Sequence, residues 1–154
     1  MCVIPDGAHI DEVRGNADAD EWRHCQQGSV PCAPGKNYFG RGPLQLTWNY
    51  NYQEAGQAIR FDGINDPGIV ARDPVISFKT AIWFWMTQTT TGESLTCHQA
   101  MEDEERFGVT IDNINGGYEC HKQYSQSQQD RIELYKSYCH KLGIHVNHED
   151  HLGC

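Results

Sequence analysis

The segment Arg72–Thr87, "RDPVISFKTAIWFWMT", has the clearest helix signature in the chain. Asp73 is a good N-cap, Pro74 suits the first helical position, and the residues that follow are apolar on nearly every side. A helix that is apolar all round belongs in the interior of a domain. We therefore predict that this helix forms the buried centre of the fold and that a charge introduced at Ile82 unfolds it.

Further helices are expected on both sides of this segment. Thr47 can serve as the N-cap of a helix that runs to about Arg60. The stretch "VTIDNINGG" predicts a short helix that ends at Gly116–Gly117, and residues 125–143 have an amphipathic pattern that stops at Gly143. Strand signals are short and few, so the predicted fold class is mainly α.

Length and charge limit the kind of protein. A chain of 154 residues is one domain by size, so we expect a single domain over residues 1–154. The net charge of −9 disfavours nucleic acid and anionic membranes as partners, because both require a clustered basic surface. No apolar run reaches the roughly 18 residues of a membrane-spanning helix. A monomer with a neutral ligand fits this composition best.

The cysteines indicate an oxidising compartment. Seven cysteines are many for a reduced cytosol, and none shows the C-x-x-C spacing of a zinc site. The first residues, "MCVIPDGAHIDE", lack the pattern of a signal peptide. Because an odd count leaves one cysteine without an intramolecular partner, we expect a secreted domain whose N-terminal part is missing.

The segment Gly35–Tyr52, "GKNYFGRGPLQLTWNYNY", indicates the ligand. Aromatic rings alternate there with amide and hydroxyl side chains. A pyranose ring has an apolar face that stacks on aromatic rings and a rim of hydroxyls that needs donors and acceptors. The segment therefore predicts a sugar-binding cleft.

Four blocks of the chain resemble those of one enzyme family, in the same order. They are "PCAPGKNYFGRGPLQLTWNYNY", "GINDPGIVARDPVISFKTAIWFWM", "NINGGYEC" and "RIELYKSYCHKLG". Together they are similar to the glycoside hydrolase family 19 chitinases, in particular the compact class IV type of plants. The resemblance covers about residues 7–154. It implies a lysozyme-like, two-lobed, mainly α fold in which part of the N-terminal lobe is missing.

The resemblance also implies a reaction. Family members hydrolyse β-1,4 bonds between N-acetylglucosamine units with inversion, using two carboxyl groups about 6.5 to 9.5 Å apart. The segment "AHIDEV" resembles the block around the general base, which places that base at Glu12. The segment before it, "MCVIPDG", has no His-Glu-Thr block, so the general acid is expected to be absent. Asp6 is the only carboxylate there.

The cleft residues are expected by the same resemblance. Thr47 matches a hydroxyl residue that holds the catalytic water, and Arg131 matches an arginine near the carboxylates that keeps the base ionised. Val30 departs from the family, because members often have an aromatic residue there. The positions expected to contact substrate are Tyr38, Gln45, Tyr50, Asn51, Asn115 and Arg131.

Two disulfides are similar to family pairs, Cys25–Cys32 and Cys120–Cys154, while Cys2, Cys97 and Cys139 stay unassigned. The tail "HVNHEDHLGC" raises the question of a metal, because it holds three histidines beside carboxylates. It meets no recognised zinc spacing, so we expect neither a metal nor another cofactor.

Two alternatives to a chitinase stay open. A chain that kept its sugar contacts and lost its acid is a non-catalytic protein that binds chitin oligosaccharides. A lysozyme-like enzyme can also act on peptidoglycan.

Overall fold

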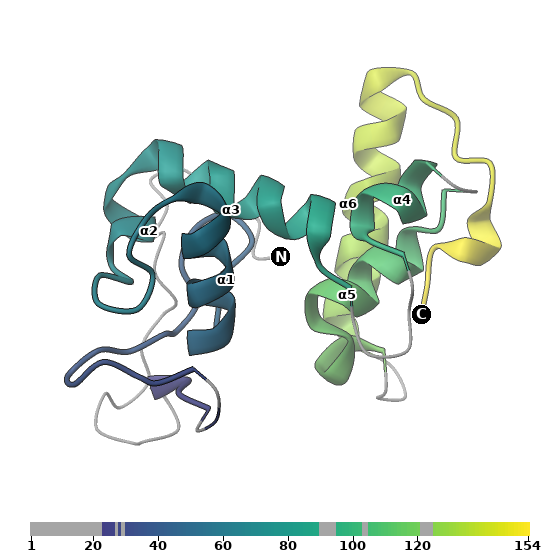
Figure 1. The fold of residues 1–154 in the computed structure, drawn as a ribbon. Coiled ribbons are helices and arrows are strands. Elements are labelled where there is room, and N and C mark those ends of the chain that lie inside the picture. The colour runs from purple at the N-terminus through teal and green to yellow at the C-terminus, as the bar shows by residue number, and fades with distance from the viewer. Residues whose placement is uncertain (1–22, 27, 29, 90–94, 103–104, 121–124) are drawn as a thin grey trace. The chain divides into compact units, whose positions relative to one another are not determined.

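The computed structural model describes residues 23–26, 28, 30–89, 95–102, 105–120 and 125–154. The chain divides into two compact units, Met1–Phe84 and Trp85–Cys154, and each is described by itself. Helices dominate both, which confirms the mainly α fold class (Figure 1). Among the described residues, β pairing is limited to an isolated bridge between Arg41 and Leu46, and no helix has the length and apolar character needed to cross a membrane.

The core of the first unit contains two fully buried tyrosines, Tyr38 and Tyr52. The unit contains α1 (Asn49–Ile59), α2 (Ile69–Arg72) and the larger part of α3 (Pro74–Thr87), with α1 and α2 beside the first half of α3 (Figure 1). Apolar residues of α1, α2 and the preceding loop form its core, and Ile76 and Trp83 of α3 pack against that core. The fully or nearly fully buried members are Tyr38, Leu46, Tyr52, Ala55 and Val70.

The prediction that α3 is the buried centre of the fold is wrong. Only Ser77 and Thr80 of this helix are buried. One stripe of apolar side chains is exposed instead, with Val75 at 59%, Phe78 at 62%, Ile82 at 61% and Met86 at 44%. We call these four residues the α3 stripe. Because α3 is apolar on every side, its sequence does not show which side packs against the protein. The core of the first unit contacts the side with Ile76 and Trp83, and the α3 stripe stays exposed.

This correction reverses an expectation about Ile82. Because its side chain is largely exposed, Ile82→Asp is expected to change the free energy of unfolding by no more than about 1 kcal/mol. Tyr52→Ala, at a fully buried position of the same unit, is expected to cost about 3 to 5 kcal/mol. Urea unfolding followed by circular dichroism compares the two. A loss at Ile82 equal to that at Tyr52 would contradict the placement of α3.

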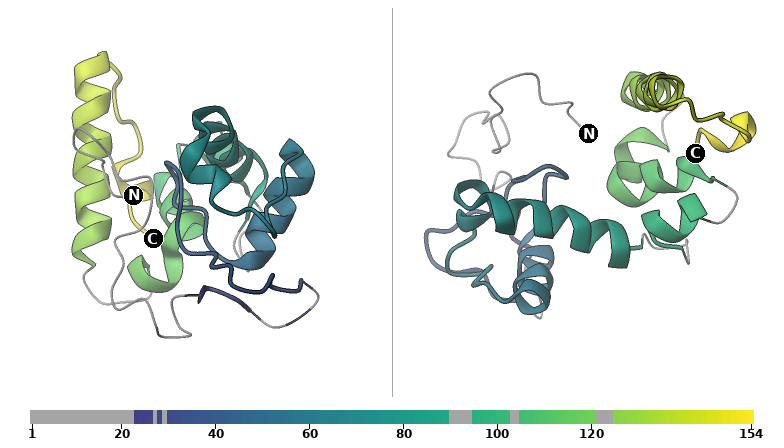
Figure 2. Two further views of the ribbon diagram at one scale, coloured as in Figure 1. Left: turned by 90° about the vertical axis from the view of Figure 1, so that its left-hand side faces the viewer. Right: turned by 90° about the horizontal axis from the view of Figure 1, so that it is seen from above.

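The second unit consists of α4 (Cys97–Glu102), α5 (Phe107–Glu119), α6 (Gln126–Leu142) and a 3₁₀ turn, η2 (Glu149–His151). Helix α5 contacts both α4 and α6, and Figure 2 shows the three gathered together. The rings of Phe107 and Tyr135 stack with centroids 4.3 Å apart, which joins α5 to α6. Cys97 and Ile111 are fully buried inside this unit.

The helix ends follow the sequence in part. Asp73 caps α3, since its Oδ1 accepts from the backbone N–H groups of Val75 (2.8 Å) and Ile76 (3.1 Å). Gly143 ends α6 as predicted, with φ of 68°. Thr47 is not the N-cap of α1, because the helix begins at Asn49 and no side chain caps it.

Helix α5 does not end at the two glycines. It continues to Glu119 with a kink at Asn115, where φ is −156° and ψ is 34°. A Cβ at Gly116 would lie 1.8 Å from the Oδ1 atom of Asp112, so a glycine permits the chain to stay helical there. The absence of a side chain at Gly116 thus leaves room for the Asp112 carboxylate, and the two glycines do not stop the helix.

Candidate functional site

The loop before α1 is a tight turn that presents polar side chains. Arg41 and Leu46 exchange two backbone hydrogen bonds, and the N–H of Gln45 donates to the carbonyl of Gly42 at 3.0 Å. The turn uses left-handed backbone angles at Gly42 (φ 77°) and at Gln45 (φ 52°). A Cβ at Gly40 would lie 2.8 Å from the Oε1 atom of Gln45. The glycine leaves room for the glutamine side chain over the turn.

Three polar side chains follow one another from this turn into the start of α1, and we call Gln45, Thr47 and Asn51 the polar row. Gln45 Nε2 donates to Gly42 O at 3.0 Å, Thr47 Oγ1 to Gln45 O at 2.7 Å, and Asn51 Nδ2 to Thr47 O at 2.8 Å. All three residues are partly exposed. Because each contact fixes one donor, the side chains are oriented, while a hydroxyl or amide oxygen can still accept from a ligand.

Asn49 and Tyr50, the first two residues of α1, lie between Thr47 and Asn51 of the polar row in the sequence. Asn49 is fully buried, and its side-chain amide makes three hydrogen bonds to the backbone of Gln26 and Val30. Tyr50 is half-buried, and burial, followed by the charge of Glu54, raises the pKa of its phenol. Tyr50 therefore remains protonated at neutral pH and is able to donate a hydrogen bond.

Tyr38 does not line a groove. Its ring has no exposed area, and its hydroxyl donates to Ile64 O at 3.0 Å and accepts from the N–H of Ala33 at 2.9 Å. The tyrosine ties two loops to the core of the first unit, and no face of it is exposed for stacking on a sugar.

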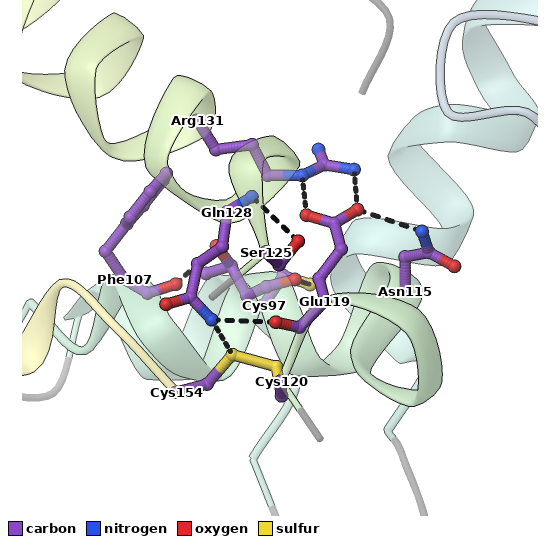
Figure 3. The surroundings of a disulfide bond; sticks show 10 residues. Cys97, Phe107, Asn115, Glu119, Cys120, Ser125, Gln128, Arg131 and Cys154 are labelled. Carbon is purple, nitrogen blue, oxygen red and sulfur yellow. Dashed lines mark hydrogen bonds and ion pairs between the residues drawn. A yellow bond between two sulfur atoms is a disulfide. The ribbon is translucent and has the colours of Figure 1, made fainter. Parts of the chain in front are cut away.

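In the second unit, Asn115 and Arg131 converge on the carboxylate of Glu119 (Figure 3). Arg131 makes two parallel hydrogen bonds, from Nε to Oε2 at 2.7 Å and from Nη2 to Oε1 at 2.8 Å. Asn115 Nδ2 donates to Oε1 at 2.9 Å. The side chain of Arg131 is 10% exposed and that of Glu119 3% exposed. This is a buried ion pair with the paired geometry that favours arginine over lysine.

The environment of Glu119 favours its charged form. Burial raises the pKa of a carboxyl, but the hydrogen bonds from Arg131 and Asn115 and the charge of the guanidinium outweigh burial and lower the pKa of Glu119. The side-chain oxygens of Glu119 therefore act as hydrogen-bond acceptors at neutral pH. They hold the Asn115 amide at the kink of α5.

Both disulfides expected from the resemblance are present, Cys25–Cys32 and Cys120–Cys154. The second lies next to Glu119 in the chain. Gln128 Nε2 donates to Glu119 O at 3.0 Å and lies 3.1 Å from the Sγ of Cys154, so α6, the end of α5 and the C-terminus meet there (Figure 3). Cys97 and Cys139 are free and buried, and Cys2 lies outside the described residues.

The histidines of the C-terminal tail make other contacts. His148 and His151 stack with ring centroids 5.1 Å apart, while Glu149 pairs with Lys136 at 2.7 Å. Within the described part of the chain, no three histidine, cysteine or acidic residues are grouped to hold a metal. Burial raises the pKa of the Cys97 thiol to about 11, so it stays neutral and is a poor metal ligand or nucleophile.

The predicted site residues divide between the units. Gln45, Thr47, Tyr50 and Asn51 lie together in the first, and Asn115 and Arg131 lie together in the second. Glu12 lies outside the described residues.

Glu119 is a site residue that the sequence did not single out. Its signal was available: Glu119 follows Asn115 by four residues, which places both on one helical face.

Comparison with known proteins identifies the family. The family model for glycoside hydrolase family 19, described as "Chitinase class I", matches residues 11–154. An acidic endochitinase of Dioscorea japonica is 44% identical over 137 residues, which is 88% of this chain and 51% of that protein. Chitinase 5 of Oryza sativa subsp. japonica is 46% identical over 138 residues, or 88% of this chain and 43% of that protein.

Two solved structures share the fold. The class IV chitinase of Zea mays superimposes with a TM-score of 0.75 at 40% identity, over 94% of this chain and 64% of that one. Chitinase C of Streptomyces griseus HUT6037 gives a TM-score of 0.81 at 35% identity, over 95% of this chain and 68% of that one. The chain therefore belongs to glycoside hydrolase family 19. It spans about half the length of the curated relatives it matches.

Proposed function

We propose that this chain carries the sugar-binding and water-activating part of an endo-acting chitin hydrolase, whose substrate is a polymer of β-1,4-linked N-acetylglucosamine. The observation that carries the proposal is the polar row of Gln45, Thr47 and Asn51 in a member of a chitinase family. Oriented amides and hydroxyls suit a neutral sugar, and the net charge of −9 disfavours an anionic polymer.

The proposed mechanism is inversion with Glu12 as general base. Thr47 Oγ1 donates to Gln45 O at 2.7 Å, which fixes its hydroxyl hydrogen and leaves its lone pairs to accept from a water. A water held in this way can give its other proton to Glu12 as it attacks the anomeric carbon. The leaving oxygen also requires a general acid, and we assign that role to no residue of these 154.

In the second unit, we propose that Asn115 contacts an N-acetylglucosamine unit and that the Glu119–Arg131 pair positions it. Asn115 is exposed, and its Nδ2 is already bound to Glu119 at 2.9 Å. This contact fixes the orientation of the Asn115 side-chain amide. Its oxygen is then able to accept a hydrogen bond from a sugar hydroxyl or acetamide N–H.

The setting of the enzyme is also a proposal. Two disulfides favour an oxidising compartment, so we propose a secreted protein whose 154 residues act as one monomeric domain.

Calorimetric titration with an N-acetylglucosamine tetramer tests the binding. The intact chain should bind the tetramer, and Asn51→Ala should weaken the binding free energy by about 1 to 3 kcal/mol because a ligand group loses its partner. Asn65→Ala is the matched control, since Asn65 is exposed and bonded to Asp62 in another turn of the first unit. If the intact chain gives no heat of binding and no measurable affinity for the tetramer, the proposed function is wrong.

For residues 1–154 taken alone, which contain no His-Glu-Thr block, the second candidate is a protein that binds chitin oligosaccharides without cutting them. General acid catalysis contributes about 10² to 10⁴-fold, so release of reducing ends from a chitin hexamer should be slow by at least that factor. Turnover at the rate of an intact family member, abolished in Glu12→Gln, would exclude the binder and make Asp6 the first candidate for the acid. A parallel titration with a peptidoglycan fragment tests the remaining alternative.

A further inference from the structure

Trp48 combines two unusual properties at the edge of the polar row. It lies directly after Thr47, and 38% of its surface is exposed. Its backbone has φ of 76° and ψ of 139°, a conformation that residues other than glycine rarely adopt. A bulky indole at such a position is strained, and strain of this kind is often found at binding sites.

The surrounding structure holds this conformation in place. The N–H of Trp48 donates to Tyr38 O at 2.8 Å, and Tyr38 is fully buried. The next residue, Asn49, is fixed by its three side-chain hydrogen bonds to Gln26 and Val30. These contacts of Trp48 with Tyr38, and of Asn49 with Gln26 and Val30, therefore hold the backbone of Trp48 in its unusual conformation.

The ring itself is oriented. The ring of His24 meets the indole at 88° with centroids 5.0 Å apart, as in an edge-to-face contact. Tyr50 lies nearly parallel to Trp48, at 8° with centroids 6.3 Å apart. Two aromatic rings with nearly one orientation thus belong to residues next to Thr47 and Asn51 in the chain.

This arrangement has the chemistry that a pyranose ring requires. The C–H groups of the sugar pack on an aromatic face, while its hydroxyl and acetamide groups need hydrogen bonds at the rim.

We propose that Trp48 is a sugar-stacking residue. The exposed part of its indole packs on the apolar face of an N-acetylglucosamine ring whose polar groups bind Thr47 and Asn51. The inference rests on the proposed function and adds to it a residue that determines affinity for the sugar.

A purely structural role for Trp48 makes different predictions. If the indole served only to fill space against His24, its removal would lower stability and leave sugar affinity intact in the folded protein. Trp48→Gly separates the two roles, because glycine relieves the backbone strain while removing the ring. Its unfolding midpoint should stay at or above that of the unchanged protein even though binding is lost.

The experiment is a titration of the full chain with the N-acetylglucosamine tetramer, read by calorimetry and by tryptophan fluorescence. Trp48→Ala and Trp48→Gly should weaken binding at least about tenfold and abolish the fluorescence change, whereas Trp48→Phe, which keeps a ring, should retain most of the affinity. Trp83→Phe is the control, since Trp83 packs against the core of the first unit. It should keep both signals.

The outcomes separate this inference from the proposed function. If the unchanged chain binds the tetramer and Trp48→Gly binds it equally well, the stacking role is wrong and the proposed function stands. If the unchanged chain does not bind, both are overturned. Loss of binding in Trp48→Phe together with Trp48→Ala would also overturn the stacking role, because a ring should then have been sufficient.

Discussion

Arg131→Met is expected to destabilise the protein by about 3 to 5 kcal/mol at neutral pH. Its side chain is 10% exposed and holds the 3% exposed carboxylate of Glu119 through two hydrogen bonds. Methionine fills a similar space but leaves a buried negative charge without its cation. Denaturant unfolding followed by circular dichroism measures the loss.

Arg72→Met is the matched control for Arg131→Met. Arg72 also makes two hydrogen bonds to a carboxylate, that of Asp66, but the two side chains are 62% and 45% exposed. An exposed pair contributes about 0 to 1 kcal/mol. The double variant Arg131→Met with Glu119→Met should be more stable than Arg131→Met alone, because it removes both buried charges. Equal losses in the two single variants would contradict the burial of the Glu119 pair.

The effect of Arg131→Met depends on pH in a defined direction. The pKa of Glu119 is lowered in the folded protein, so its contribution to stability is present above the pKa of the unfolded chain and is lost as pH falls through the folded pKa. In the variant the carboxyl is buried without a cation, and acid relieves the penalty by protonating it. The difference in the free energy of unfolding between Arg131→Met and the unchanged protein should therefore become smaller as the pH is lowered.

Removing the Cys120–Cys154 disulfide is the second change with a large expected effect. The bond closes a separation of 34 residues, which in the chain-entropy description corresponds to about 4 kcal/mol. Replacement of both cysteines by serine should lower the free energy of unfolding by that amount. The Gln128 side chain would also lose its contact with Cys154 at the end of α5.

The Cys25–Cys32 disulfide provides the comparison. It spans only 7 residues, so the chain-entropy description gives it a contribution of about 2 kcal/mol to the free energy of unfolding. Unfolding of the two double-serine variants in guanidinium chloride should rank them in this order. The opposite order would mean that contacts at the shorter bond, not loop closure, dominate the stability that disulfides confer here.

The sequence predicted the features that depend on local chemistry or on family blocks. Asp73 caps α3 because a carboxylate at that position reaches two free N–H groups, and Gly143 ends α6 because glycine tolerates a left-handed backbone. The cysteine pairs followed from the resemblance. These features need only a few neighbouring residues or a close match.

Features that depend on packing were harder to predict. Helix α3 is apolar on every side, and no periodicity distinguishes Ile76, which packs on the core, from Ile82, which is exposed. Tyr38 has the character of a cleft residue, but the fold buries its ring and uses its hydroxyl to join two loops. The pairing of Arg131 with Glu119 could not be chosen from the sequence, because the two residues lie in different helices, α6 and α5, and only the packing of these helices brings them together.

The α3 stripe has a consequence for the colloidal behaviour of the chain. Four large apolar side chains stand open to water on every molecule, and a net charge of −9 keeps the molecules apart. Salt screens this repulsion, and titration toward the isoelectric point of about 5.2 removes it. Under either condition stripe-to-stripe contact becomes favourable, so turbidity should rise with ionic strength and with acid, and a small amount of detergent should clear it.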